Sequence, residues 1–311
     1  MAKELVSVLV PLYNDAKYVL KTLECICSQT YENLEIVICD DGSTDGSCEL
    51  VEGISDKRIV LLKNEKNEGI AYTRNRLFDY AHGEYLAIWD ADDLCPIDRI
   101  EKETEAAKIH GADVVTGYYQ CIDEDDKPFG EIAYTRSNPG YIRAGLLFGN
   151  MIANSTALVR REFVNAHAIR YKKRMIGDYL FWVECSLNNA RFYTVPEVML
   201  LYRIHSQSIT QVSNDKNVAQ RNQIVAEIQK TAFSGTGFQL SDQEYDCLFK
   251  NFCEHPGTVD SKEELEELYY VLKKICDQSV ELGLPNTKEI HDYCRNRFAA
   301  RINLAKFLWG M

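Results

Sequence analysis

The sequence predicts an α/β fold in which helices flank a mostly parallel sheet, followed by a helical C-terminal extension. Three observations support this prediction. Short apolar runs alternate with helical patterns over the first hundred residues, the connections between them are short, and polar residues follow several of the apolar runs. Strands that alternate with helices in this way form parallel sheets covered on both faces. Ligands of such sheets bind beyond the carboxyl ends of the strands.

The first hundred residues are expected to supply four strands and three helices. Apolar runs predict strands at residues 5–11, 34–39 and 58–62, and a buried strand from residue 85 up to the carboxylates at 90–93. Helical patterns cover residues 16–28, 47–54 and 70–81. Turn and helix-cap residues occupy 40–46, and a loop is expected at 64–69.

The pattern loosens after residue 96, where we expect an insertion that shapes a substrate cleft. The expected elements are a helix at 99–110, a strand at 113–119, a loop-rich stretch as far as residue 149, a strand at 155–159, helices at 161–166 and 178–188, and strands at 192–195 and 198–202. Beyond about residue 212 the chain is mostly helical, with helices expected at 218–232, 241–252, 262–281 and 287–309. A domain boundary is placed there.

The composition excludes several classes of protein. Lys and Arg total 35 against 47 Asp and Glu, a net charge of −12, which argues against a nucleic-acid partner because phosphate binding needs a basic surface. The 11 cysteines lack Cys-x-x-Cys spacing and fit reduced thiols in a cytosol. No signal peptide is recognised, and no apolar run reaches the roughly 20 residues of a membrane span.

Three carboxylates, Asp90, Asp92 and Asp93, directly follow the apolar run that begins at Tyr85. Because side chains alternate across a strand, Asp90 and Asp92 are expected to leave its end in the same direction. Carboxylates this close repel one another unless a cation lies between them, so they indicate a divalent-cation site. A polar turn with a helix cap is the alternative. Two further polar pairs follow expected strands and should face the same crevice: Tyr13-Asn14 and Asp40-Asp41.

Seven segments of the first ninety-odd residues occur in a characteristic order. They are Val8-Leu9-Val10-Pro11-Leu12-Tyr13-Asn14, Ser28-Gln29-Thr30-Tyr31, the stretch from Glu35 to Asp45, Asn67-Glu68-Gly69, Arg74-Asn75, Gly83-Glu84-Tyr85 and Asp90-Ala91-Asp92-Asp93. Together they resemble the inverting glycosyltransferases of family 2, which have the GT-A (Rossmann-like) fold. The resemblance continues more thinly through Ile176-Gly177-Asp178-Tyr179 and Tyr202-Arg203-Ile204-His205, and covers about two thirds of the chain.

The resemblance implies transfer of a sugar from a UDP-sugar donor to a hydroxyl of a saccharide or lipid-linked saccharide acceptor, in bacterial-type polysaccharide biosynthesis. It implies a catalytic domain at residues 1–211, with a nucleotide-sugar-binding half at 1–95 and an acceptor-binding half at 96–211. Residues 212–311 form the helical C-terminal region. The expected location is the cytoplasm, at the inner face of the cell membrane if the C-terminal helix binds lipid.

The resemblance also assigns residues to the nucleotide sugar. Pro11 and Tyr13 would line the base and ribose, and Asp41 would accept a hydrogen bond from the uracil ring N–H, which suits an acceptor-only carboxylate. Arg74 would point toward the diphosphate, and Asp90 would hold the ribose or uridine. The same set includes Asn14, Asn67, Gly69 and Asp93. Loop packing for Tyr13, a turn cap for Asp41 and a surface ion pair for Arg74 are the structural alternatives.

Catalytic roles follow from the same resemblance. Asp92 would bind Mg²⁺ or Mn²⁺ bridging the two phosphates, with His205 as a further metal or diphosphate contact and Arg203 on the diphosphate. Asp178 would be the base that removes the proton of the acceptor hydroxyl. The family carries a Glu before this Asp, and here Gly177 precedes it. The alternative for Asp178 is an ordinary helix N-cap.

Asn150 and Trp182 are expected on the acceptor side, because sugars stack on aromatic rings, with core packing as the alternative for the aromatic residue. Residues 295–309 form a basic amphipathic helix that could contact a membrane, a second subunit or its own domain.

Other functions fit the sequence less well. A nucleotidyltransferase needs a Gly- and basic-rich loop after its first strand, which residues 11–17 lack, and no Gly-x-Gly-x-x-Gly of a dinucleotide-dependent oxidoreductase follows a strand. A non-catalytic nucleotide-sugar-binding scaffold on the same fold remains open.

Overall fold

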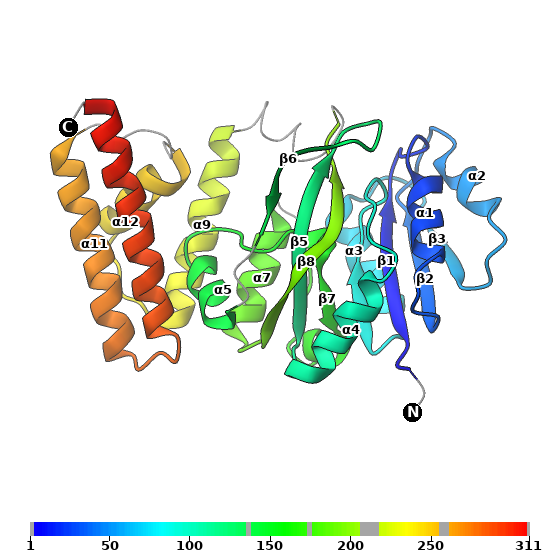
Figure 1. Ribbon diagram of the computed structural model, residues 1–311, viewed down its shortest axis with the longest axis horizontal. Coiled ribbons are helices and arrows are strands. Elements are labelled where there is room, and N and C mark those ends of the chain that lie inside the picture. The colour runs from blue at the N-terminus through cyan, green and yellow to red at the C-terminus, as the bar shows by residue number, and fades with distance from the viewer. Residues whose placement is uncertain (1–2, 135–137, 173–175, 206–217, 255–260, 310–311) are drawn as a thin grey trace.

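A single eight-stranded sheet organises the protein, with helices on both of its faces (Figure 1). The computed structural model describes residues 3–134, 138–172, 176–205, 218–254 and 261–309. The strand order is β3-β2-β1-β4-β7-β5-β6, and β8 pairs with β5 outside this path. The strands β1 to β3 lie at one end of the molecule in Figure 1, and the C-terminal helices lie at the other.

The first half of the sheet is parallel, as the sequence predicts. Its strands are β1 (Val6–Leu12), β2 (Leu34–Asp40), β3 (Ile59–Lys63) and β4 (Tyr85–Ile88), with β1 between β2 and β4. The helices α1 (Val19–Cys27), α2 (Ser47–Glu52) and α3 (Ile70–Tyr80) connect them. Every residue of β1 is buried, because this strand is covered on both faces. The carboxyl ends of β1 and β2 lie side by side, with Leu12 opposite Asp40.

The second half is mixed. The strand β7 (Leu158–Arg160) runs antiparallel to both β4 and β5 (Val114–Ile122), and β8 (Phe192–Arg203) runs parallel to β5. The two strands expected at 192–195 and 198–202 are one strand, because its pairing with β5 shifts register near Gly117 and Tyr118 without ending. The helices α4 (Arg99–His110), α6 (Arg161–Ala166) and α7 (Gly177–Leu187) confirm the expected helices in this half.

The stretch expected to be loop-rich contains two regular elements. Strand β6 (Pro128–Ala133) pairs antiparallel with β5 at the edge of the sheet, and helix α5 (Pro139–Leu146) follows it. Most of β6 is exposed, so it lacks the apolar alternation that marks a strand. The signal for α5 was present: Asn138 accepts hydrogen bonds from the backbone N–H of Gly140 and Tyr141, and Pro139 occupies the first turn. The expected strand at 155–159 begins later, after a 3₁₀ turn at Asn154–Thr156.

The expected C-terminal helices are present as α9 (Val218–Thr236), α10 (Asp242–Phe249), α11 (Lys262–Glu281) and α12 (Thr287–Trp309). A π-helical turn at Lys250–Glu254 continues α10. Buried residues of α9 to α12 belong to the same apolar cluster as those of α5 and α7, so the helical region packs on the core of the sheet domain. The division at residue 212 falls between described segments and stays a prediction.

The tail helix packs on its own chain. Tyr293 of α12 stacks on Phe148 at 5.0 Å between ring centroids and contacts Tyr141 of α5. Two of its basic residues are also used internally: Arg301 is 4% exposed and donates to the carbonyl of Asn251, and Arg297 donates to the hydroxyl of Tyr293. The basic face expected for membrane contact is therefore partly buried. Among the described residues, no helix is long and apolar enough to cross a membrane.

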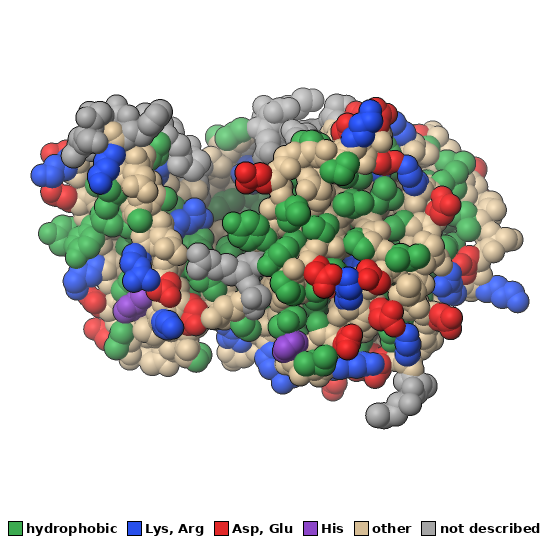
Figure 2. All heavy atoms as spheres, in the orientation of Figure 1, with side chains coloured by type: hydrophobic (Ala, Val, Ile, Leu, Met, Phe, Trp, Pro, Cys, Tyr) green, Lys and Arg blue, Asp and Glu red, His purple; other side chains and the backbone are tan. Residues whose placement is uncertain are grey.

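The visible surface carries acidic and basic side chains that are interspersed (Figure 2). No broad basic patch appears on this face, in keeping with the acidic composition.

Candidate functional site

The ends of β1 and β2 are tied together by side chains of the expected site. Asn14 has a left-handed backbone (φ 54°) and accepts a hydrogen bond from the N–H of Thr44 at 2.9 Å, while its own N–H donates to the Ser43 hydroxyl at 3.0 Å. Tyr13 is 45% exposed beside this junction and offers a ring for a planar ligand. Pro11 is buried within β1, so its side chain is not exposed to contact the nucleotide base as expected.

Asp41 organises the loop that leads into α3. Its carboxylate accepts hydrogen bonds from Asn64 Nδ2 at 2.6 Å and from the N–H groups of Glu68 and Gly69, each at 2.9 Å. The side chain is 3% exposed, so little of it remains for a uracil N–H. Asn67 is exposed on this loop. The loop passes so close to Gly42 that a Cβ there would lie 2.8 Å from the Lys66 carbonyl carbon.

The carboxylates after β4 gather as expected, though by a different geometry. The strand ends at Ile88, and a turn closed by the Asp93 N–H on the Asp90 carbonyl replaces the expected alternation. Asp90 is held between Arg74 Nη2 at 2.6 Å and the Ser155 hydroxyl at 2.5 Å. Arg74 therefore forms an ion pair in this structure, where the resemblance implied a diphosphate contact. Its guanidinium is mostly buried, and its Nε is buried with no hydrogen-bond partner.

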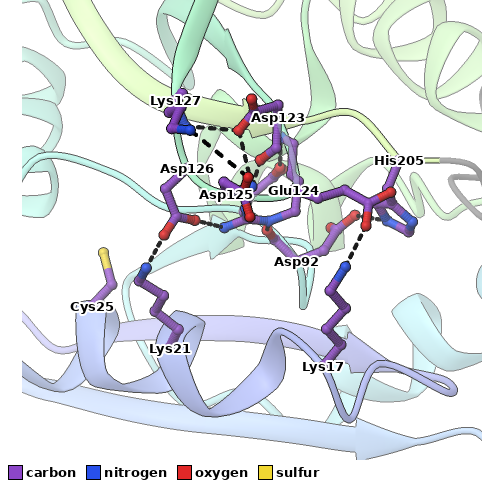
Figure 3. Close-up of polar contacts among 12 residues, drawn as sticks. Lys17, Lys21, Cys25, Asp92, Asp123, Glu124, Asp125, Asp126, Lys127 and His205 are labelled. Carbon is purple, nitrogen blue, oxygen red and sulfur yellow. Dashed lines mark hydrogen bonds and ion pairs between the residues drawn. The ribbon is translucent and has the colours of Figure 1, made fainter.

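Asp92 lies against His205, with 2.9 Å between the carboxylate and Nε2 (Figure 3). Asp93 is fully buried behind it, and burial together with the charge of Asp92 raises its pKa well above the ordinary value. One Asp93 oxygen accepts from the Arg203 N–H at 2.9 Å, and the other is buried with no partner. Asp15, which the sequence analysis did not select, faces the same group: burial and Asp92 raise its pKa to about 7.

These donors fit a divalent cation that shares its ligands with a diphosphate. Burial is the first cause of the raised pKa values of Asp15 and Asp93, and the negative charge of Asp92 adds to both. Within the described ranges, no cluster of three or more His, Cys, Asp or Glu side chains is placed to hold a metal alone. Mg²⁺ and Mn²⁺ sites of enzymes that act on phosphates commonly use one or two protein ligands plus phosphate oxygens. Asp92 and His205 fit that pattern.

Arg203, which the resemblance places on the diphosphate, is bonded to groups of the protein in this structure, and the diphosphate contact stays a prediction. Its side chain is 1% exposed and donates from Nε to the Asp92 carbonyl at 2.8 Å and from Nη1 to the Asp123 carbonyl at 2.9 Å, and it pairs with Asp126 at 2.6 Å. Its guanidinium also stacks over the Tyr18 ring. All of these groups belong to the protein, so Arg203 anchors the turn that carries Asp92.

The acidic turn between β5 and β6 lies over the start of α1 (Figure 3). Glu124 pairs with Lys17 and Asp126 pairs with Lys21, which joins the turn to the helix that follows Asp15. The sequence does not indicate the partners of this turn, because contacts over about a hundred residues of chain leave no local signal. The acidic turn is thus joined to the start of α1 by ion pairs and to Asp92 through Arg203.

Asp178 lies in the first turn of α7 and is held by Asn150, whose Nδ2 donates to the carboxylate at 2.8 Å. Burial raises the pKa of Asp178 above its ordinary value, and the positive charge of Arg74 opposes that rise. Arg74 thus interacts with both Asp90 and Asp178. Asn150 is exposed, which is consistent with an acceptor-side position.

Trp182 was expected on the acceptor side and is instead fully buried. It lies one turn along α7 from Asp178, with 0% exposure, and packs edge-to-face against Phe181. Phe181 in turn stacks on Tyr171 at 4.6 Å between ring centroids. The helix faces the apolar core with these rings, so the core alternative holds for Trp182.

Comparisons with known proteins identify the class. The model of the family described as glycosyl transferase family 2 matches residues 7–167. The chain therefore belongs to glycosyl transferase family 2, and it is a glycosyltransferase that takes its sugar from a nucleotide sugar.

Two curated relatives are informative. The glycosyltransferase GlyG of Streptococcus pneumoniae serotype 4 is 41% identical over 128 residues, which cover 40% of this chain and 42% of GlyG. The chain thus spans less than half of that relative. WfaP of Escherichia coli is 30% identical over 223 residues, covering 70% of this chain and 85% of WfaP, and is named a UDP-Glc:α-D-GlcNAc-diphosphoundecaprenol β-1,3-glucosyltransferase.

Solved structures share the fold. Residues 1–349 of Staphylococcus aureus TarS, in complex with UDP-GlcNAc, match with a TM-score of 0.65 at 17% identity, covering 98% of this chain and 92% of that chain. The mannosyltransferase PcManGT of Pyrobaculum calidifontis, in complex with GDP-Man and Mn²⁺, matches with a TM-score of 0.58 at 18% identity, covering 98% and 87%. At these identities the likeness establishes the GT-A-like fold alone.

Proposed function

We propose that this chain transfers a sugar from a UDP-sugar to a hydroxyl of a saccharide or lipid-linked saccharide, with a divalent cation and with inversion at the sugar carbon. One observation carries the proposal: Arg74 pairs with a carboxylate at the end of β4 and also stabilises the ionised form of Asp178. Arg74 thereby links the group of carboxylates that follows β4 with the candidate base Asp178. The name of WfaP supports a UDP-sugar donor and a lipid-linked acceptor.

The donor would lie across the ends of β1, β2 and β4. Tyr13 offers an exposed ring for the base, and Asp90 offers a carboxylate for ribose hydroxyls, although Arg74 and Ser155 already hold it. Asp92 and His205 would hold Mg²⁺ or Mn²⁺. When bound, that ion stabilises the negative charge on the leaving nucleoside diphosphate.

Asp178 would accept the proton of the attacking hydroxyl on the opposite side of the sugar. A base works in its ionised form, and two neighbours favour that form: the N–H of Asn150 and the charge of Arg74. Burial acts the other way and keeps the carboxylate basic enough to take a proton. A single carboxylate in this role requires inversion, because the hydroxyl attacks opposite the departing diphosphate.

The test is transfer from a panel of UDP-sugars, with Mn²⁺, to a polyprenyl-diphosphate-linked GlcNAc acceptor. We expect a product whose new linkage has the anomeric configuration opposite to that of the donor. Asp178→Asn should lower turnover by about a hundredfold or more while UDP still binds, a typical scale for losing a general base. Glu184→Gln, on the same helix, is the matched control and should keep wild-type turnover. Retained configuration, or full turnover by Asp178→Asn, would refute the proposal.

A further inference from the structure

Two thiols face each other between α1 and the loop that follows Asp92. Cys25 lies in the last turn of α1, and Cys95 lies three residues after Asp92, with 3.6 Å between their sulfur atoms. Cys25 projects from α1 on the same side as Lys21 (Figure 3). Cys25 is half-buried, and Cys95 is 9% exposed behind it. The pair is unused by the proposed reaction.

The surrounding hydrogen bonds keep the two thiols facing each other. The N–H of Cys95 donates to Cys25 Sγ at 3.3 Å, and Gln29 Nε2 lies 3.3 Å from Cys95 Sγ. Gln29 also joins the two segments, because its Nε2 donates to the Pro96 carbonyl at 3.0 Å and its Oε1 accepts from the Ile100 N–H at 3.2 Å. The end of α1 and the loop after Asp92 are thus held in one register.

The two sulfurs differ in reactivity. Hydrogen bonding from Cys95, with a contribution from the charge of Arg99, lowers the pKa of Cys25 to about 7, while burial raises that of Cys95 well above its ordinary value. Cys27, two residues further along α1, is the opposite case: burial and Asp56 raise its pKa to about 11. A half-buried thiol with a lowered pKa therefore lies in contact with a second thiol that can resolve its oxidised form.

We propose that Cys25 and Cys95 form an oxidisable dithiol, a modification site at which a peroxide closes a disulfide between α1 and the Asp92 segment. The Cys25 thiolate attacks one oxygen of hydrogen peroxide and breaks the O–O bond, giving a sulfenic acid and a hydroxide that takes a proton to become water. The Cys95 sulfur then attacks Cys25 Sγ and displaces the hydroxyl, which leaves as water with the Cys95 proton. Two thiols and one peroxide become one disulfide and two waters.

Closure of this bond should disturb the donor site, a consequence that rests on the proposed function. The sulfurs must approach from 3.6 Å to about 2 Å. Leu94, which lies between Asp93 and Cys95, is tied by two backbone hydrogen bonds, at 3.1 and 2.7 Å, to Leu201 of β8, the strand that also carries Arg203. A shift of Cys95 is therefore passed through Leu94 to the turn that carries Asp92 and Asp93 and to Arg203, which holds that turn. Misplacement of a ligand-holding residue by about 1 Å weakens its function strongly, so UDP affinity with Mn²⁺ should fall about tenfold.

The experiment treats the purified protein with hydrogen peroxide, alkylates the remaining thiols and maps disulfides by peptide mass spectrometry. We expect a Cys25–Cys95 link that dithiothreitol reverses, its loss in Cys95→Ser, and its persistence in the matched control Cys27→Ser. Absence of the link in the wild-type protein, or Cys25 joined to scattered thiols, overturns the dithiol. This mapping needs no nucleotide, so it is independent of the proposed function.

Calorimetric titration of UDP with Mn²⁺ into the reduced and oxidised proteins then tests the consequence. The expected result is weaker binding to the oxidised form of the wild type and of Cys27→Ser, and no effect of peroxide on Cys95→Ser. Equal binding by the two forms of the wild type overturns the effect on the donor site. No UDP binding by the reduced protein would instead count against the proposed function.

Discussion

Replacing Arg203 by Lys distinguishes an anchoring residue from a diphosphate ligand. The Arg203 side chain is 1% exposed and makes three hydrogen bonds, to the carbonyls of Asp92 and Asp123 and to the Asp126 carboxylate, at 2.8, 2.9 and 2.6 Å. A lysine ammonium is a single point and cannot reproduce this planar arrangement. If two bonds are lost, at about 1.5–3 kcal/mol for each bond to a charged group, the free energy of unfolding should fall by about 3 kcal/mol or more.

The assay is urea denaturation of wild-type and Arg203→Lys proteins, read by tryptophan fluorescence. Arg295→Lys is the matched control: Arg295 is 74% exposed and pairs with Asp292, so its replacement should change the free energy of unfolding by less than about 0.5 kcal/mol. If Arg203→Lys unfolds like the wild type but binds UDP at least about tenfold more weakly, the anchoring role is wrong and the diphosphate contact is reinstated.

Three further predictions concern the candidate base Asp178, the turn that carries Asp92 and the packing around Gly83. Asn150→Ala removes an N–H that stabilises ionised Asp178, so the pKa of that base should rise further. The acidic limb of the pH–turnover profile should then move to higher pH, and an unchanged limb would contradict the assignment of Asp178 as the base. Asp126→Asn should raise the Mn²⁺ concentration at which UDP binding is half-maximal, because Asp126 holds Arg203, which anchors the Asp92 turn. Asp125→Asn in the same turn is the control, since Asp125 is 79% exposed and should not change this concentration. Equal titration curves for the two variants would argue against the anchoring role of Arg203. Gly83→Ala should lower the free energy of unfolding by about 3 kcal/mol, since its Cβ would lie 2.5 Å from the Ser7 nitrogen. Gly53→Ala is the control in the same denaturation assay and should be close to neutral, because the nearest atom to its Cβ would be 3.4 Å away.

Much of the fold could be predicted because the buried strands have a strong local pattern. The strands β1, β2 and β4 are apolar at nearly every position, and the helices between them carry one apolar face, so each signal lies within its own segment. The exposed strand β6 was missed for the same reason, since an edge strand that faces solvent has no such pattern. For α5 the cap at Asn138 and Pro139 would have been enough.

The sequence could predict which residue types follow the strand ends of the site, but not the contacts that these residues make. The resemblance selects Asp92, His205 and Asp178, and the structure brings Asp92 and His205 into contact. The resemblance does not reveal which of these side chains bind other parts of the protein. Arg203 forms an ion pair with Asp126, and Trp182 is buried in the core. Both outcomes depend on contacts between segments far apart in the chain. The carboxylate of Asp15 was passed over because it resembles an ordinary loop residue until Asp92 is placed beside it.

The most direct test of the central claim is calorimetric titration of UDP into the purified protein with and without Mn²⁺, with ADP and GDP as controls. The account predicts UDP binding that requires the metal, exceeds that of the other nucleotides and is lost in Asp92→Asn. Equal binding of all three nucleotides, or UDP binding that is indifferent to both Mn²⁺ and Asp92, would contradict it.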